Sequence, residues 1–153
     1  MIDPFSLTQA HSSAIEYLSR REHASLELRQ KLTRKGFDQS VIDNLVIQLQ
    51  QNNLLSDARF AECYIRARIN KGFGPLHIQQ ELLKRGIERE LFSEMLNTND
   101  VDWIKRVHLL REKRFGQDVP QSKRELDKQV RFLQYRGFTH FQIQSVLSSD
   151  DNW

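Results

Sequence analysis

Three glycines about 50 residues apart constrain the fold of this chain more than any other feature of its sequence. Each one ends a run of helix-forming residues and stands between a cation and an apolar residue, in Lys35-Gly36-Phe37, Arg85-Gly86-Ile87 and Arg136-Gly137-Phe138. Glycine ends a helix readily because it adopts the left-handed backbone conformation that other residues resist. Another apolar-periodic segment follows each glycine, so the sequence predicts one helical unit used three times.

The spacing of apolar residues predicts three helices in each unit. Ser25 is expected to cap the second helix of the first unit, and Ser56 or Asp57 the first helix of the second unit. Pro75 follows a turn with two glycines and suits the first position of the next helix. No segment alternates with period two over a useful length, so no sheet is expected. The predicted fold is all-α, with three-helix repeats at residues 6–53, 54–98 and 99–150.

Two single residues carry further expectations. Gln129 stands at the place before the closing glycine that Leu28 and Ile78 hold in the other units, so the apolar set of the third unit is expected to shift by one residue. Cys63, the only cysteine, is expected to be a small core residue inside a helix. A chain of three such units presents an extended surface suited to a large partner rather than a pocket for a small molecule.

The sequence suggests no catalytic residues, cofactor or metal. The five histidines are isolated, a single cysteine cannot form a CxxC pair, and the loop Gly72-Phe-Gly-Pro75 lacks the residues of a phosphate-binding loop. No apolar run is long enough to cross a membrane, and the first residues do not resemble a signal peptide, so the expected compartment is the cytoplasm.

Positive charge is concentrated in the last third of the chain. The net charge is +3 overall, yet residues 103–136 contain ten Lys and Arg against four Asp and Glu. Clustered charge raises the local potential, so this part could meet an acidic protein or nucleic acid, although an ordinary solvated helical surface explains it equally well.

Residues 55–87, LSDARFAECYIRARINKGFGPLHIQQELLKRGI, closely resemble the signature of the RecX family of recombinase regulators. The matching features are Asp57, the pair Phe60-Ala61, Arg68, the turn at 72–75 and the closing Arg85-Gly86-Ile87. The segments 29–37 and 128–138 resemble the first and last modules of the same family.

This resemblance implies an elongated, curved array of three-helix repeats that performs no chemistry. It also implies a cytoplasmic regulator of DNA recombination, repair and the SOS response, expected to be a monomer, which binds the RecA recombinase and its filament on single-stranded DNA. Binding would inhibit ATP hydrolysis and strand exchange. The expected contact residues are cations of the middle module and the basic last third: Arg59, Arg66, Arg68, Lys71, Arg124, Lys128 and Arg131.

Two other functions stay open. Three helices with a glycine turn also describe helix-turn-helix modules, but the third helix of the first unit contains no Lys or Arg with which to hold DNA. Weak, non-specific DNA binding through the basic last third is the alternative function. The remaining possible function is that of a generic helical scaffold, although a period of about 50 residues does not match tetratricopeptide repeats.

Overall fold

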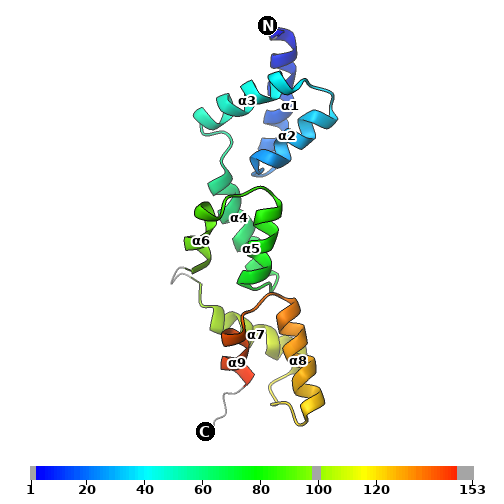
Figure 1. The fold of residues 1–153 in the computed structure, drawn as a ribbon, viewed down its shortest axis with the longest axis vertical. Helices are drawn as coiled ribbons and strands as arrows, with labels where there is room; N and C mark the ends of the chain where they lie inside the picture. The colour runs from blue at the N-terminus through cyan, green and yellow to red at the C-terminus, as the bar shows by residue number, and fades with distance from the viewer. Residues whose placement is uncertain (1–2, 98–100, 148–153) are drawn as a thin grey trace. The chain divides into compact units, whose positions relative to one another are not determined.

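The structure, a computed structural model, describes residues 3–97 and 101–147, and every regular element in these two ranges is an α-helix (Figure 1). The predicted all-α repeat fold, without a sheet, is confirmed for them. Each unit contributes three helices in succession. They are α1 (Pro4–Arg20), α2 (Ser25–Arg34), α3 (Gln39–Gln51), α4 (Asp57–Asn70), α5 (Pro75–Lys84), α6 (Arg89–Asn97), α7 (Trp103–Phe115), α8 (Lys123–Tyr135) and α9 (His140–Leu147).

The three glycines end α2, α5 and α8 as predicted. Gly36, Gly86 and Gly137 have φ angles of +94°, +81° and +94°. In each case the glycine N–H and the next N–H donate backward to the last turn of the helix. The second of these bonds runs from Phe37, Ile87 and Phe138 to the carbonyls of Leu32, Leu82 and Leu133, with N···O distances of 3.3, 3.0 and 3.2 Å. This is the Schellman arrangement, which satisfies the last helical carbonyls.

The helix starts follow the sequence less closely. Ser56 is the residue that caps α4, because its Oγ accepts from the N–H of Arg59 at 3.1 Å. Ser25 does not cap α2, so that prediction is wrong: the helix begins at Ser25 itself, and Ala24 precedes it without a side-chain cap. The carboxylate of Asp57 instead accepts from both the N–H and the Oγ of Ser25, at 2.7 and 3.0 Å. Pro75 begins α5 as expected.

By packing, the described chain falls into two compact parts. The first contains residues 3–63 and 82–92, and the second contains residues 64–81, 93–97 and 101–147. The three predicted domains and the elongated, curved form of the array stay predictions. The first part has a core of aliphatic residues from α1, α2 and α3, namely Ala10, Ala14, Leu28, Leu32, Val41, Ile42, Leu45, Val46 and Leu49, with Leu55 after them.

The second part has its core between α7, α8 and α9. Its buried apolar members are Val107, Leu133, Phe138, Ile143 and Val146. Trp103 packs edge-on against the Phe138 ring, and its indole N–H donates to the carbonyl oxygen of Leu96 at 2.8 Å. This bond satisfies the polar end of a large, half-buried side chain.

The expected one-residue shift in the third unit is wrong. Gln129 is only 3% exposed and occupies the core position that its repeat equivalents hold. Its Oε1 accepts from Nε of the buried Arg111 at 3.0 Å, and the same guanidinium donates to the Asp118 carbonyl at 2.6 Å. The buried amide of Gln129 and the buried guanidinium of Arg111 satisfy each other by hydrogen bonding. The third unit therefore keeps the register of the other two, although residue 129 is polar.

Cys63 is exposed, which contradicts the expectation of a core residue. The buried positions of α4 are Phe60, Ala61, Ile65 and Ile69, which follow a helical period that leaves position 63 on the solvent side. Its small apolar character, rather than its place in the period, led to the wrong assignment.

Candidate partner-binding surface

Two turns of the second part are joined by backbone hydrogen bonds. The turn between α4 and α5 lies against the turn between α8 and α9, and we call this contact the turn joint. The N–H of Gly74 donates to the Arg136 carbonyl at 2.7 Å, and the N–H of Leu76 donates to the Gly137 carbonyl at 2.9 Å. The Gly-x-Gly-Pro turn that characterises the middle module therefore serves as a docking element for the third module.

Close approach of the two backbones explains the glycines of the turn joint. A Cβ on Gly74 would lie 2.6 Å from the carbonyl carbon and oxygen of Gly137. A Cβ on Gly137 would lie 2.3 Å from the Cβ of His77 and 2.5 Å from its backbone nitrogen. No real Cβ tolerates such distances from backbone atoms, so both positions require glycine for steric reasons.

Arginine and aromatic side chains alternate beside the turn joint. The Arg68 guanidinium lies 4.0 Å and that of Arg136 lies 5.0 Å from the centroid of the Phe73 ring. Arg136 also lies 5.2 Å from the Phe132 ring and donates to the Lys71 carbonyl at 3.1 Å. Stacking of this kind holds a guanidinium in place and keeps part of its edge available for a partner.

Two of the seven predicted contact residues are held by ion pairs. Arg68 donates through Nε and Nη2 to the two carboxylate oxygens of Glu81, at 2.9 and 3.0 Å. Arg59 donates to Glu22 at 3.0 Å and to the Asn53 carbonyl at 2.8 Å. Both side chains are partly buried, so each arginine has a structural role in addition to any contact with a partner.

The other five predicted contact residues are exposed and form no ion pair with any described residue. Arg66 lies on α4, and Lys71 lies just after that helix. The remaining three, Arg124, Lys128 and Arg131, lie on one face of α8 because their spacing of four and three residues returns to the same side of a helix. We call these three residues the α8 basic stripe. The stripe continues one turn further to Tyr135, whose side chain is 79% exposed.

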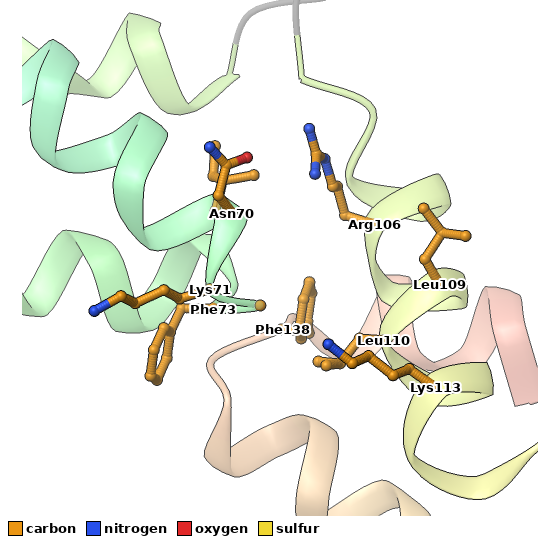
Figure 2. A pocket seen from close by; sticks show the side chains of 10 residues that line it. Asn70, Lys71, Phe73, Arg106, Leu109, Leu110, Lys113 and Phe138 are labelled. Atoms are coloured by element: carbon orange, nitrogen blue, oxygen red, sulfur yellow. The ribbon is translucent and has the colours of Figure 1, made fainter.

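A small groove lies beside the turn joint (Figure 2). Residues 69–73 form one wall and helix α7 the other, and Phe138 closes the space between them. Its volume is about 150 Å³, less than the several hundred Å³ typical of small-molecule sites. Figure 2 shows Lys113 reaching from α7 toward Phe138 and Arg106 extending from α7 into the gap across from Asn70, whereas the Lys71 side chain points away from α7.

Sequence reasoning counted Arg106 and Lys113 in the basic last third but did not select them as contacts. Their spacing of seven residues on one helix, with Leu109 and Leu110 between them, was the available signal. The opposite wall could not be found from the sequence because it belongs to another module.

Two kinds of feature are absent from the described residues, a metal-ligating cluster and a membrane-spanning helix. Among residues 3–97 and 101–147, no group of three or more His, Cys, Asp or Glu side chains could hold a metal ion. None of the helices in these ranges is long and apolar enough to span a membrane.

Successive groups of three helices, with no strand in the described residues, define an all-α helical-repeat protein. Three family models match the chain in order: the first three-helix domain of RecX at residues 10–49, the second at 56–96 and the third at 100–147. The chain therefore belongs to the RecX family.

Curated relatives agree with this assignment. Regulatory protein RecX of Halorhodospira halophila (strain DSM 244 / SL1) is 40% identical over 139 residues, which are 91% of this chain and 86% of the relative. Regulatory protein RecX of Legionella pneumophila (strain Corby) is 40% identical over 141 residues, or 92% and 94% of the two chains. These relatives are named regulatory proteins and not enzymes.

Solved structures agree on the fold. The crystal structure of RecX from Lactobacillus salivarius superposes with a TM-score of 0.79 at 24% identity, covering 94% of this chain and 96% of that chain. A second crystal structure, of a regulatory protein RecX, gives a TM-score of 0.76 at 22% identity, covering 95% and 72%.

Proposed function

We propose that this protein binds the RecA recombinase, including its filament on single-stranded DNA, and inhibits ATP hydrolysis and strand exchange. The observation that carries this proposal is the ordered match of three RecX domains to residues 10–49, 56–96 and 100–147. The protein would act as a monomer in the cytoplasm, as a regulator of recombination, repair and the SOS response. It would itself catalyse no reaction.

Inhibition would follow from several modest contacts made by linked units. When one unit is bound, the effective concentration of the next unit is raised, so the chain can bridge neighbouring recombinase protomers without a single strong contact. An elongated, curved array lying in the filament groove would hinder filament extension or the motions coupled to ATP turnover.

The cations that form no ion pair are the better contact residues in this proposal. Arg66, Lys71 and the α8 basic stripe can meet carboxylates without losing an existing ion pair. Arg59 and Arg68 would contribute only through their exposed edges, because their carboxylate partners already occupy part of each guanidinium.

The test adds the purified protein to preformed recombinase filaments on single-stranded DNA and follows ATP hydrolysis. Substoichiometric protein should slow the reaction, and Arg66→Glu should weaken this inhibition with no change in helicity. Glu62→Lys, which reverses an exposed charge one turn earlier on α4, is the control with the opposite sign and should not weaken it. If the wild-type protein leaves the rate unchanged while it binds naked DNA tightly, the proposal fails.

A second candidate function is non-specific DNA binding, favoured by the α8 basic stripe and the exposed Tyr135 beyond it. Cations placed along a helix can follow a phosphate backbone, and an exposed aromatic ring can stack on an unpaired base. A steep loss of DNA affinity with added salt, in the absence of recombinase, would support this activity.

A further inference from the structure

Helix α7 presents two cations and two leucines on the side that lines the groove. Arg106, Leu109, Leu110 and Lys113 follow the spacing i, i+3, i+4 and i+7, which places all four on one helical face. At a rise of about 1.5 Å per residue, the two cationic residues stand about 10 Å apart along the axis, with the leucines between them. Neither cation forms an ion pair with a described residue, and Leu109 is 50% exposed.

The rest of the groove combines apolar groups with two polar side chains, those of Asn70 and Lys71. Phe138 closes it and is 2% exposed, Ile69 lines the opposite wall, and Asn70 adds one amide. Gly72 belongs to the same wall, where an added Cβ would stand 3.1 Å from Cδ1 of Leu110. The backbone of the turn therefore sits tightly against α7, which fixes one end of the groove.

We propose that this groove receives an acidic and apolar segment of the protein partner, with an aliphatic side chain between two carboxylates about 10 Å apart. This inference rests on the proposed function and names the chemistry of the recombinase segment that the second part recognises. Two cations at the ends of a leucine pair are complementary to that pattern, since charges at the rim select the orientation and the apolar centre supplies burial.

Nucleic acid fits this groove less well. A base needs an exposed aromatic face for stacking, but Phe138 is buried. The Phe73 ring has Arg68 at 4.0 Å and a stacked His77 at 4.6 Å from its centroid, so its faces are occupied as well. An aliphatic side chain needs no such face, which favours a protein segment.

The experiment measures the affinity of the full chain, labelled at the exposed Cys63, for recombinase filaments and separately for naked oligothymidine at the same salt concentration. The test variant is Arg106→Glu with Lys113→Glu. Its matched control is Lys105→Glu with Lys123→Glu, which makes the same change of charge at exposed positions outside the groove. A third variant, Leu109→Ala, removes the half-exposed apolar contact.

The groove variant should lose at least about tenfold in affinity for the filament, the control pair less than about threefold, and Leu109→Ala about threefold or more. Circular dichroism should show unchanged helicity in all of them. Equal losses in the groove and control pairs would mean that only overall charge matters, and they would overturn the inference.

Two further outcomes would also overturn it. If oligothymidine affinity falls in parallel with filament affinity, the occupant is nucleic acid. If the groove variant binds the filament as well as the wild type, the groove is not used, while the proposed function stands. A wild-type protein that does not bind the filament at all would instead refute the proposed function itself, so the two failures are distinguishable.

Discussion

Replacing Gly137 by alanine should destabilise the protein more than the same replacement at Gly36, although the two glycines have the same backbone conformation. Both end a helix in a Schellman motif, and both have a φ angle of +94°. They differ in their surroundings: a Cβ at position 36 would meet nothing within 4 Å, whereas one at position 137 would lie 2.3 Å from the His77 Cβ. Comparing the two variants therefore separates the contribution of the turn joint to stability from that of the glycine that ends the helix.

The magnitude follows from two terms. A left-handed conformation costs an alanine about 1–2 kcal/mol, and the reduced entropy of the unfolded chain changes both variants alike. Gly36→Ala should therefore cost about 1–2 kcal/mol. Gly137→Ala adds the contact with His77, and forcing extra volume against a packed backbone typically costs about 1–3 kcal/mol more. Opening the joint would also lengthen the bonds to Gly74 and Leu76, each worth about 1 kcal/mol.

Urea denaturation followed by circular dichroism at 222 nm measures the free energy of unfolding of both variants. A change in its slope against urea concentration would reveal independent unfolding of the two parts. A difference of at least about 1 kcal/mol in the free energy of unfolding is expected. If the two variants are equally stable, the close approach at Gly137 has no energetic consequence and the turn joint does not hold the modules together. Gly74→Ala tests the other side of the joint and should also destabilise the protein.

Three other predictions concern the interior and the charged surface. Gln129→Leu restores the apolar residue of the other repeats, but it leaves the Arg111 Nε–H buried without its acceptor and should lower the free energy of unfolding by about 1–3 kcal/mol in chemical denaturation. Adding Arg111→Met should recover part of the loss. A Gln129→Leu variant that is more stable than the wild type would contradict the reasoning. Burial lowers the pKa of His23 below its ordinary value of 6.5, so below pH 6.5 the unfolded chain takes up a proton that the folded protein resists. The free energy of unfolding should thus decrease as the pH falls from 6.5 toward that lowered pKa, and His23→Gln should remove this part of the profile when urea midpoints are compared between pH 5 and 8; an unchanged profile would argue against it. Replacing the three cations of the α8 basic stripe by glutamine should weaken the salt dependence of single-stranded DNA binding. The slope of the logarithm of the binding constant against the logarithm of salt concentration should become shallower by about 2, at about 0.7 per phosphate contact. An unaltered slope would place the DNA contacts elsewhere.

Much of the local structure is predictable from the sequence because it depends on neighbours in the chain. The glycine stops, the start of α5 at Pro75 and the cap at Ser56 follow from backbone preferences that act over a few residues. The prediction that Ser25 caps α2 is wrong because the hydrogen bonding of Ser25 depends on a residue far away in the sequence. The N–H of Ser25 is taken by Asp57, which is 32 residues away in the sequence, and no local rule contains that partner.

The candidate surface shows the same division. Sequence reasoning found that the last third is basic and selected seven cations, but it could not tell which were already paired. Arg59 and Arg68 have carboxylate partners at separations of 37 and 13 residues, and these separations have no helical period to reveal them. The Arg111–Gln129 pair is similar, since a polar residue at a core position looks like a shift of register until its partner is known.

By itself, the sequence determined the repeated helical unit, the glycine stops that end the second helix of each unit, and membership of the RecX family. Turn chemistry and periodic burial are encoded locally, so neighbouring residues suffice to reveal them. Only the tertiary structure decided what the middle Gly-x-Gly-Pro turn is for. Its two glycines could be read as a helix stop alone, yet the Gly74 backbone approaches the Gly137 backbone, 63 residues later, closely enough to exclude any side chain. That contact, and the groove beside it, arise because packing brings together chain segments that no sequence period connects.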